Sequence, residues 1–306
     1  MIFTQKNLKA FLSVVDEGSI SRAAKKVNIS QPALSRLVGE LEARLGINLF
    51  ERQSQGVVPT AEGAELVHYA RHVLSELNDA REALESLQGL KRGVVRIGAV
   101  ALAARCLLPQ VLNNFLTKEP GLRVELVEDS DAHLAPALLR REIDVVIGGY
   151  AEPGEGLHRL GVCHFSDSFT VICRAGHPLL EQPDVTLDDV LAERWIMPMH
   201  DSSPHHMLGK LLRDLNRPMP TIAIETKTLG TIFSLIAHTD FLAWGPSALF
   251  QTETHPTLFR NIPIHELDLK RKLYVYRRDK GIVSEAVKRF LAEIPMTRTE
   301  FAGRCS

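Results

Sequence analysis

The stretch from Asn28 to Gly46 constrains the fold most, because it predicts one amphipathic helix with a defined start. Ser30 is a favourable N-cap, and Pro32 lies in the first turn, where its missing N–H costs no hydrogen bond. The apolar side chains that follow recur at helical spacing and form one stripe: Leu34, Leu37, Val38, Leu41 and Leu45. At the front of the helix, Gln31, Ser35 and Arg36 lie off this stripe, and on an isolated helix they would be ordinary solvated side chains.

Two shorter helices and a wing are expected around this helix. Four apolar residues share one helical face before Gly18 ends the first helix: Leu8, Phe11, Leu12 and Val15. Ser19 or Ser21 then caps a short helix over residues 22–28. Residues 50–63 predict a wing, because a Gln-Ser-Gln-Gly turn precedes a short strand at 57–58. Residues 1–59 therefore form a domain of helix, tight turn, helix and wing.

A long helix with a heptad pattern follows. Thr60 is a suitable N-cap, and neither Gly nor Pro interrupts residues 64–88. Seven apolar positions recur at alternating spacings of four and three residues: Leu66, Ala70, Val73, Leu77, Ala80, Leu84 and Leu87. This seam is narrower than the stripe of a helix that packs on its own domain, so self-association is favoured. We assign residues 60–90 to a linker and dimerisation helix, with a break at residues 88–93.

Beyond Gly93 the chain alternates strands and helices to about residue 294. Such alternation predicts an α/β fold with a mostly parallel sheet that is covered on both faces. Roughly 210 residues exceed what one such sheet usually needs, so two lobes with a cleft between them are expected. Residues 91–306 form this regulatory region, with lobe I at about 94–161 and 269–294 and lobe II at about 165–265.

Composition and charge exclude several classes of protein. The 306 residues are 45% hydrophobic and 24% charged, which is typical of globular chains and unlike disordered or fibrous ones. Neither a secretory signal nor an apolar run of about 18 residues is visible, so a cytoplasmic protein that does not span a membrane is expected. Residues 1–60 hold eight basic and five acidic side chains, an excess that fits an anionic partner at this end. The cysteines lack a CxxC motif, so ordinary thiols are favoured over a redox pair of Cys163 and Cys173.

The sequence resembles LysR-type transcriptional regulators along its whole length. In the first domain the family pattern is matched by Ala23, Ala24, Ser30, Gln31, Pro32, Ala33, Leu34, Ser35, Leu41, Glu42, Leu45, Gly46, Leu49, Phe50, Arg52, Thr60 and Gly63. The resemblance continues through "RIG" at 96–98, "LLP" at 107–109, "REIDVVIG" at 141–148 and "AGHPL" at 175–179. It implies a winged helix-turn-helix, a dimerisation helix and a two-lobed sensor of the periplasmic-binding-protein type, in a sequence-specific DNA-binding regulator.

The resemblance also implies that residues 31–43 enter the major groove of DNA. Gln31 suits adenine edges, Ser35 a base or a phosphate, and Arg36 guanine or a phosphate. The other expected contacts lie on the same helix, the short helix before it and the wing: Pro32, Ser21, Arg22, Lys25, Arg52, Gln53 and Ser54, with Lys26 less specific. Gly39 departs from the family pattern, and it either permits close approach to the DNA backbone or is a tolerated defect.

Assembly and partners follow from the same resemblance. Two copies would pair through the long helix and present two reading helices, so the DNA target is expected to be an inverted repeat. A homodimer that assembles further into a homotetramer is expected, with RNA polymerase and a small-molecule effector as the other partners.

The effector is expected between the lobes, in loops that follow strand ends. The positions carried over are Val100, Ala101, Leu102, Ser130, Asp131, Met199, His200, Asp201, Ser202, Thr226 and Thr228. Ala101 and Leu102 offer apolar surface and helix N-terminal amides that favour an anion. Asp131 is expected to act as a helix N-cap rather than to face the cleft. A hydroxylated acid, an aromatic acid and a sugar-related metabolite stay open, and the polar candidates favour a hydroxyl-rich ligand.

Other functions are disfavoured. His200, Asp201, His205 and His206 suggest a metal site, but adjacent histidines cannot easily share one ion, so neither a metal nor another cofactor is expected. An enzyme is not expected, because no GxSxG, HExxH or GxxxxGK[ST] motif is present. A transport-type binding protein would share the two-lobed region, but it would need a signal peptide and would not use the first 90 residues.

Overall fold

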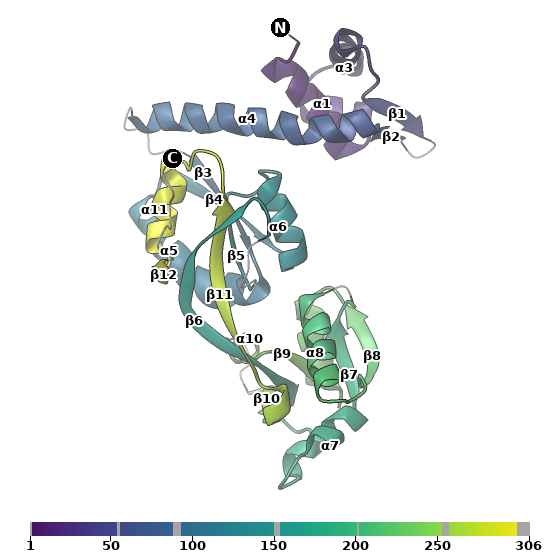
Figure 1. The fold of residues 1–306 in the computed structure, drawn as a ribbon, viewed down its shortest axis with the longest axis vertical. Coiled ribbons are helices and arrows are strands. Elements are labelled where there is room, and N and C mark those ends of the chain that lie inside the picture. Colours follow the sequence, from purple (N-terminus) through teal and green to yellow (C-terminus); the bar gives the residue numbers. More distant parts are fainter. Residues whose placement is uncertain are drawn as a thin grey trace. The chain divides into compact units, whose positions relative to one another are not determined.

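The computed structural model describes residues 2–53, 56–87, 93–149, 154–200, 202–252 and 257–298. The chain divides into two compact units. Unit 1 comprises Met1–Arg92 with Gly281–Glu285, and unit 2 comprises Gly93–Lys280 with Ala286–Ser306. Figure 1 shows the helices and strands of both. Among the described residues, no helix has the length and apolar character needed to cross a membrane.

Unit 1 is a helical domain with a small wing. Its elements are α1 (Gln5–Glu17), α2 (Ile20–Lys26), α3 (Gln31–Leu45), β1 (Phe50–Gln53), β2 (Gly56–Pro59) and α4 (Ala61–Leu87). β1 and β2 pair antiparallel. The order of helix, turn, helix and wing confirms the fold predicted for this part of the chain.

Short polar residues and glycines set the ends of these helices. The side chains of Thr4, Ser19 and Ser30 accept hydrogen bonds from the first turns of α1, α2 and α3. The alternative cap for α2 at residue 21 is therefore not used. Gly18 and Gly46 adopt left-handed backbone conformations that end α1 and α3, as glycine does at low cost.

The core of unit 1 joins α3 to α1 and α4. Leu34, Val38 and Leu41 of α3 are buried, as the apolar stripe predicts. Ala70 of α4 is only 1% exposed and packs in one cluster with α1, and Leu66 packs against that cluster. The start of the predicted heptad seam is therefore occupied by the chain's own core. The expectation that all seven positions face a second copy is wrong at these two residues.

Unit 2 contains a two-stranded parallel sheet of β7 (Arg194–Pro198) and β8 (Thr221–Thr226) and a larger eight-stranded sheet. The strands of the larger sheet are β3 (Gly93–Ala99), β4 (Leu122–Glu128), β5 (Val145–Gly148), β6 (Leu157–Arg174), β9 (Ala243–Pro246), β10 (Phe259–Ile262), β11 (Leu269–Arg278) and β12 (Met296–Arg298). The main order is β10-β6-β11-β5-β3-β4, and β9 and β12 pair with β6. β3 runs parallel to β4 and β5, whereas every pairing of β6 and β11 is antiparallel. The prediction of a mostly parallel sheet is wrong, because β11 runs antiparallel to both of its neighbours, β5 and β6, and β9, β10 and β12 run antiparallel to β6.

Those two long strands connect two lobes (Figure 1). β6 pairs with β12 near its start and with β9 and β10 near its end, and β11 accompanies it. Lobe I also carries a π-helical turn (Ala103–Leu107), α5 (Leu108–Lys118), α6 (Asp131–Leu139) and α11 (Glu285–Glu293). Lobe II carries α7 (Leu187–Ala192), β7 (Arg194–Pro198), α8 (Ser203–Asp214), β8 (Thr221–Thr226), α9 (Leu229–His238) and α10 (Ser247–Thr252).

Each lobe has its own packed interior. In lobe I the rings of Phe115 on α5 and Phe290 on α11 meet edge to face, with centroids 5.5 Å apart. In lobe II both tryptophans of the chain, Trp195 and Trp244, are buried in one cluster. Their indole N–H groups donate to the carbonyls of Val190 and Leu267. These contacts tie β7 and β9 to the interior of lobe II.

Candidate functional site

The N-terminal half of α3 presents a polar face on the surface of unit 1. Gln31, Pro32, Ser35 and Arg36 are all exposed, while Leu34 between them is buried. The Arg36 side chain is 82% exposed, and its Nε donates to a carboxylate oxygen of Glu40 at 3.0 Å. An exposed pair of this kind contributes little stability, so the guanidinium is available to a competing anion or base edge.

The basic side chains of α2 are exposed and partly engaged. Ser21, Arg22 and Lys25 lie on the surface, as their predicted role requires. Arg22 Nε donates to the Glu17 carbonyl at 3.2 Å, which satisfies a free acceptor at the end of α1. Lys26 pairs with the Glu17 carboxylate at 2.8 Å. Arg22 therefore has a structural contact, whereas Lys25 is exposed and forms no ion pair with a residue in the described part of the chain.

The wing docks on the turn between α1 and α2. Val57 N–H donates to the Gly18 carbonyl at 2.9 Å, and a Cβ at Gly56 would lie only 2.5 Å from that oxygen. Glycine at position 56 therefore allows the two backbones to approach. Gln53 is exposed at the end of β1. Ser54 lies outside the described residues, as does the side chain of Arg52, whose backbone belongs to β1.

The outer part of the heptad seam is an exposed apolar stripe on α4. Val73, Leu77 and Leu84 are 43%, 47% and 63% exposed, and Ala80 between them is also exposed. Tyr69 adds a 63% exposed ring that the heptad pattern did not include. The side chain of Leu87 lies outside the described residues. Large apolar side chains in such a row are typical of a surface that another chain covers.

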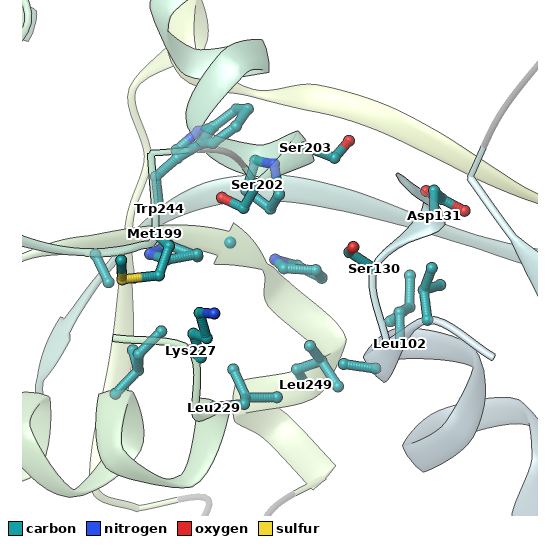
Figure 2. Close-up of a pocket in the computed structure, with 18 of the residues that line it drawn as sticks. Leu102, Ser130, Asp131, Met199, Ser202, Ser203, Lys227, Leu229, Trp244 and Leu249 are labelled. Atoms are coloured by element: carbon teal, nitrogen blue, oxygen red, sulfur yellow. The ribbon is translucent and has the colours of Figure 1, made fainter. Parts of the chain in front are cut away.

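A cavity of about 420 Å³ lies between the two lobes of unit 2. Figure 2 shows its lining, which lobe I supplies from the starts of two helices and lobe II from β7, β8, β9 and the helices that follow them. Eight predicted effector residues line it: Val100, Ala101, Leu102, Ser130, Asp131, Met199, Ser202 and Thr226. His200 and Thr228 are not among its described lining residues, and Asp201 lies outside the described residues.

Asp131 and Arg271 form a buried ion pair at the edge of this cavity. Arg271 Nη2 donates to Asp131 Oδ2 at 3.0 Å, and the two side chains are 11% and 2% exposed. Asp131 Oδ1 accepts from the Gly149 N–H at 2.9 Å. Burial raises the pKa of the Asp131 carboxyl, and the arginine and the backbone amide oppose that shift. The expectation that Asp131 caps a helix is wrong, because Ser130 is the N-cap of α6 and Asp131 is its first residue.

The remaining charges around the cavity are mostly paired. Glu128 accepts from Arg105 Nε at 3.3 Å. The Asp129 carboxylate contacts His133 Nδ1 at 2.8 Å and accepts from the Ser130 N–H at 2.7 Å. Lys227 also lines the cavity, and in the described part of the chain no carboxylate pairs with it. Among the described lining residues, Lys227 is therefore the cation without a carboxylate partner.

Most of the lining that the sequence analysis missed is apolar. It comes from strand interiors and helix starts far apart in the chain: Phe169, Ile196, Leu229, Ile232, Trp244, Leu249 and Phe250. The polar residues that were missed include Ser203, Lys227 and Arg271. Lys227 lies between two predicted positions, so its place in that loop was the one signal that could have identified it.

The histidines after β7 do not form a described metal site. His205 Nδ1 lies 3.6 Å from Glu225, and His200 Nδ1 lies 4.0 Å from it. Burial lowers the pKa of His205, although Glu225 opposes the shift. Within the described ranges, no group of three or more His, Cys, Asp and Glu side chains is arranged to hold a metal ion.

Two cysteines lie on the long strand β6. Cys163 and Cys173 are buried, and burial raises the pKa of each thiol to about 12. A strand advances about 3.3 Å per residue, so the ten residues between them correspond to roughly 33 Å. This separation is too large for a disulfide without unfolding of β6.

Comparisons with known proteins agree with this architecture. Residues 5–64 match the family "Bacterial regulatory helix-turn-helix protein, lysR family", and residues 88–296 match "LysR substrate binding domain". The uncharacterized HTH-type transcriptional regulator YdcI of Escherichia coli (strain K12) is 31% identical over 254 residues, which cover 83% of this chain and 82% of the relative. The HTH-type transcriptional regulator GalR of Pseudomonas putida is 27% identical over 301 residues, which cover 98% of this chain and 76% of that protein.

Solved structures share the fold at lower identity. Full-length OxyR from Pseudomonas aeruginosa has a TM-score of 0.71 at 20% identity, with 97% of this chain and 99% of that chain covered. Full-length CbnR complexed with its target DNA has a TM-score of 0.69 at 20% identity, with 95% and 99% covered. The chain therefore belongs to the LysR family of transcriptional regulators and combines a DNA-binding helix-turn-helix domain with an effector-binding domain.

Proposed function

We propose that this regulator binds an inverted-repeat DNA site as a dimer, and that a small molecule in the interlobe cavity controls its output. The cavity of about 420 Å³, which both lobes line, is the observation that carries this proposal. Its volume falls within the range of sites for small ligands. If the lobes adopt two relative arrangements, a ligand that contacts both lobes can shift the populations of these arrangements only by binding one of them more tightly.

The exposed start of α3 supports the DNA-reading role. A helix that enters the major groove usually contacts base edges with its N-terminal residues. Gln31 can pair with adenine, and Arg36 can pair with guanine once it leaves Glu40. The related CbnR was solved in complex with its target DNA. Ser21, Lys25 and the wing would supply phosphate contacts that position α3 and depend on salt.

The apolar stripe on α4 supports dimerisation. Val73, Leu77 and Leu84 follow heptad spacing and are exposed in the single chain. A symmetric pair would bring two copies of α3 to one duplex, which accounts for an inverted repeat. Further assembly into a tetramer and contact with RNA polymerase would carry the ligand signal to transcription.

DNA selection with the full-length chain tests the reading role. A duplex is first enriched from genomic fragments, and its affinity for the wild type is then compared with that for Arg36→Met and Gln31→Ala. Each substitution is expected to weaken binding by about 1–3 kcal/mol and to relax the preference at one base pair. Lys210→Met serves as a control, because Lys210 is exposed on α8 in the other unit.

Two results would contradict the proposal. If both α3 variants keep the wild-type affinity and base preference while their circular dichroism is unchanged, α3 does not read DNA. If no fragment is enriched over competitor DNA, sequence-specific binding itself is refuted.

A further inference from the structure

We propose that the ligand of the interlobe cavity is a monocarboxylic acid with an apolar body, and that Lys227 binds its carboxylate. This inference rests on the proposed function, because it names the ligand class of the same cavity.

The walls favour an apolar body. Phe169, Trp244 and Phe250 contribute rings, and Ile196, Leu229 and Leu249 contribute aliphatic side chains. A sugar has a hydroxyl on nearly every carbon, and each would need a hydrogen-bond partner after burial. The hydroxyls available on side chains are few, namely those of Ser130, Ser202, Ser203 and Thr226. The lean toward a hydroxyl-rich ligand is therefore not supported by the walls.

The charges favour one anionic group. Arg271 cannot supply a free cation, because it already donates to Asp131 at 3.0 Å in a nearly inaccessible pair. Glu128 and Asp129 are likewise engaged, with Arg105 and with His133. Lys227 is the remaining cation of the described lining, and no carboxylate among the residues that the structure describes neutralises it. A dicarboxylate would leave its second charge among apolar side chains, which is costly.

The backbone adds to the attraction at the same place. Figure 2 shows the Lys227 side chain extending into the space that Ser130 and Ser202 also face. Ser130 and Ser202 are the N-caps of α6 and α8, so the positive ends of both helix dipoles meet there. No side-chain hydrogen bond caps α6, which leaves its first amides to another acceptor. A carboxylate beside Lys227 would meet the ammonium group of lobe II and the positive end of the α6 dipole from lobe I.

The size limits the acid to a small metabolite. A volume of about 420 Å³ lies within the range of sites for small ligands. A branched aliphatic or single-ring acid fits this space.

Calorimetric titration of the full-length protein tests the assignment. The probes are 4-methylpentanoate and 3-phenylpropionate, with their amides as neutral isosteres, and glutarate and glucose as competitors of other classes. Near pH 7 the acids are ionised. Each acid is expected to bind roughly tenfold to a hundredfold more tightly than its amide, since a charge-assisted hydrogen bond is lost. Glutarate and glucose are expected to bind more weakly than both acids.

Variants identify the residue. Lys227→Met is expected to weaken binding of the acids by a similar factor and to leave the amides unchanged. Lys210→Met, on the exposed face of α8, is expected to leave both unchanged. Equal binding of acid and amide, wild-type affinity in Lys227→Met, preference for glutarate or glucose, or no binding by any probe would each overturn the assignment.

The same proteins are also assayed on the selected duplex. Specific DNA binding without binding of either acid refutes the ligand assignment and leaves the reading role intact. Acid binding that depends on Lys227 in a protein without specific DNA binding supports the ligand assignment and refutes the proposed function.

Discussion

Replacement of Arg271 by methionine tests the buried ion pair at the edge of the cavity. The substitution keeps an extended side chain but removes the guanidinium that donates to Asp131 at 3.0 Å. Asp131 is 3% exposed, so its carboxylate would remain in a poorly solvated site, where the Gly149 N–H still donates to it at 2.9 Å. Breaking a buried pair by removing one partner costs about 3–5 kcal/mol. We expect a loss of that size at neutral pH.

The pH dependence of the stability loss provides a second, independent test of the ion pair. Burial already raises the pKa of Asp131 in the folded protein, and Arg271 opposes this shift. Without the arginine, the folded-state pKa rises further above the unfolded value. A raised carboxyl pKa favours folding at low pH, and that contribution is lost as pH rises through the folded pKa. The deficit of Arg271→Met relative to the wild type should therefore shrink between about pH 7 and pH 5.

Tryptophan fluorescence during urea unfolding measures the effect. Trp195 and Trp244 are the two tryptophans of the chain, and both lie in the core cluster of lobe II. That cluster also contains Phe169, and the guanidinium of Arg271 lies over the ring of Phe169. The fluorescence transition therefore reports on unit 2 alone. If far-ultraviolet circular dichroism gives the same urea midpoint for this transition, unit 2 unfolds cooperatively.

The double variant Asp131→Asn with Arg271→Met is the matched control. It removes both charges, and the asparagine oxygen can still accept from Gly149 N–H. We expect it to be more stable than Arg271→Met alone, because no unpaired charge is buried. A cost below about 1 kcal/mol for the single variant, a deficit that does not shrink in acid, or a double variant less stable than the single one would refute this account of the pair.

Three further predictions concern other parts of the chain. Gly39→Ala should raise the free energy of unfolding of unit 1 by about 1 kcal/mol, because nothing lies within 4 Å of the added Cβ. Calorimetry measures this effect, and an unchanged Tm would contradict it. A loss of DNA affinity in the same variant would show that Gly39 allows close approach to DNA. Leu77→Glu should dissociate the dimer in sedimentation experiments while Asn78→Glu does not, and wild-type sedimentation of both would exclude the stripe as the interface. Cys163 and Cys173 should resist alkylation near pH 8 in the folded protein, since burial raises their pKa to about 12; rapid labelling in peptide mass spectra would show that β6 opens.

The local elements could be predicted because their signals lie within a few residues. Ser30 and Pro32 mark the start of α3, and Gly46 marks its end. The direction of strand pairing could not be predicted in the same way. Segments 157–163 and 168–174 are one strand, and its partners β10, β11 and β12 come from the end of the chain. Strand composition does not record which distant strand will pair or in which direction.

The candidate cavity was predicted in part for a similar reason. The rule that ligands meet loops after strand ends located Val100, Ser130 and Met199 at its lining. It could not separate Thr226 from Thr228, because neighbouring residues of a loop point in different directions. The aromatic walls come from strand positions that look like ordinary core in the sequence. Whether such a side chain borders a cavity depends on packing between the lobes.

The connection between the lobes also determines how they can move. β6 and β11 are paired from Leu269 opposite Phe169 to Arg278 opposite Leu157, so the lobes share a two-stranded ribbon instead of single flexible linkers. Irregularities interrupt its register between Lys272 and Tyr274 and again before Tyr276, and such bulges increase local twist. The ribbon acts as a torsion element that resists bending in its own plane. In the proposed regulation, ligand binding would rotate one lobe about the long axis of this ribbon and change the twist of β6 and β11.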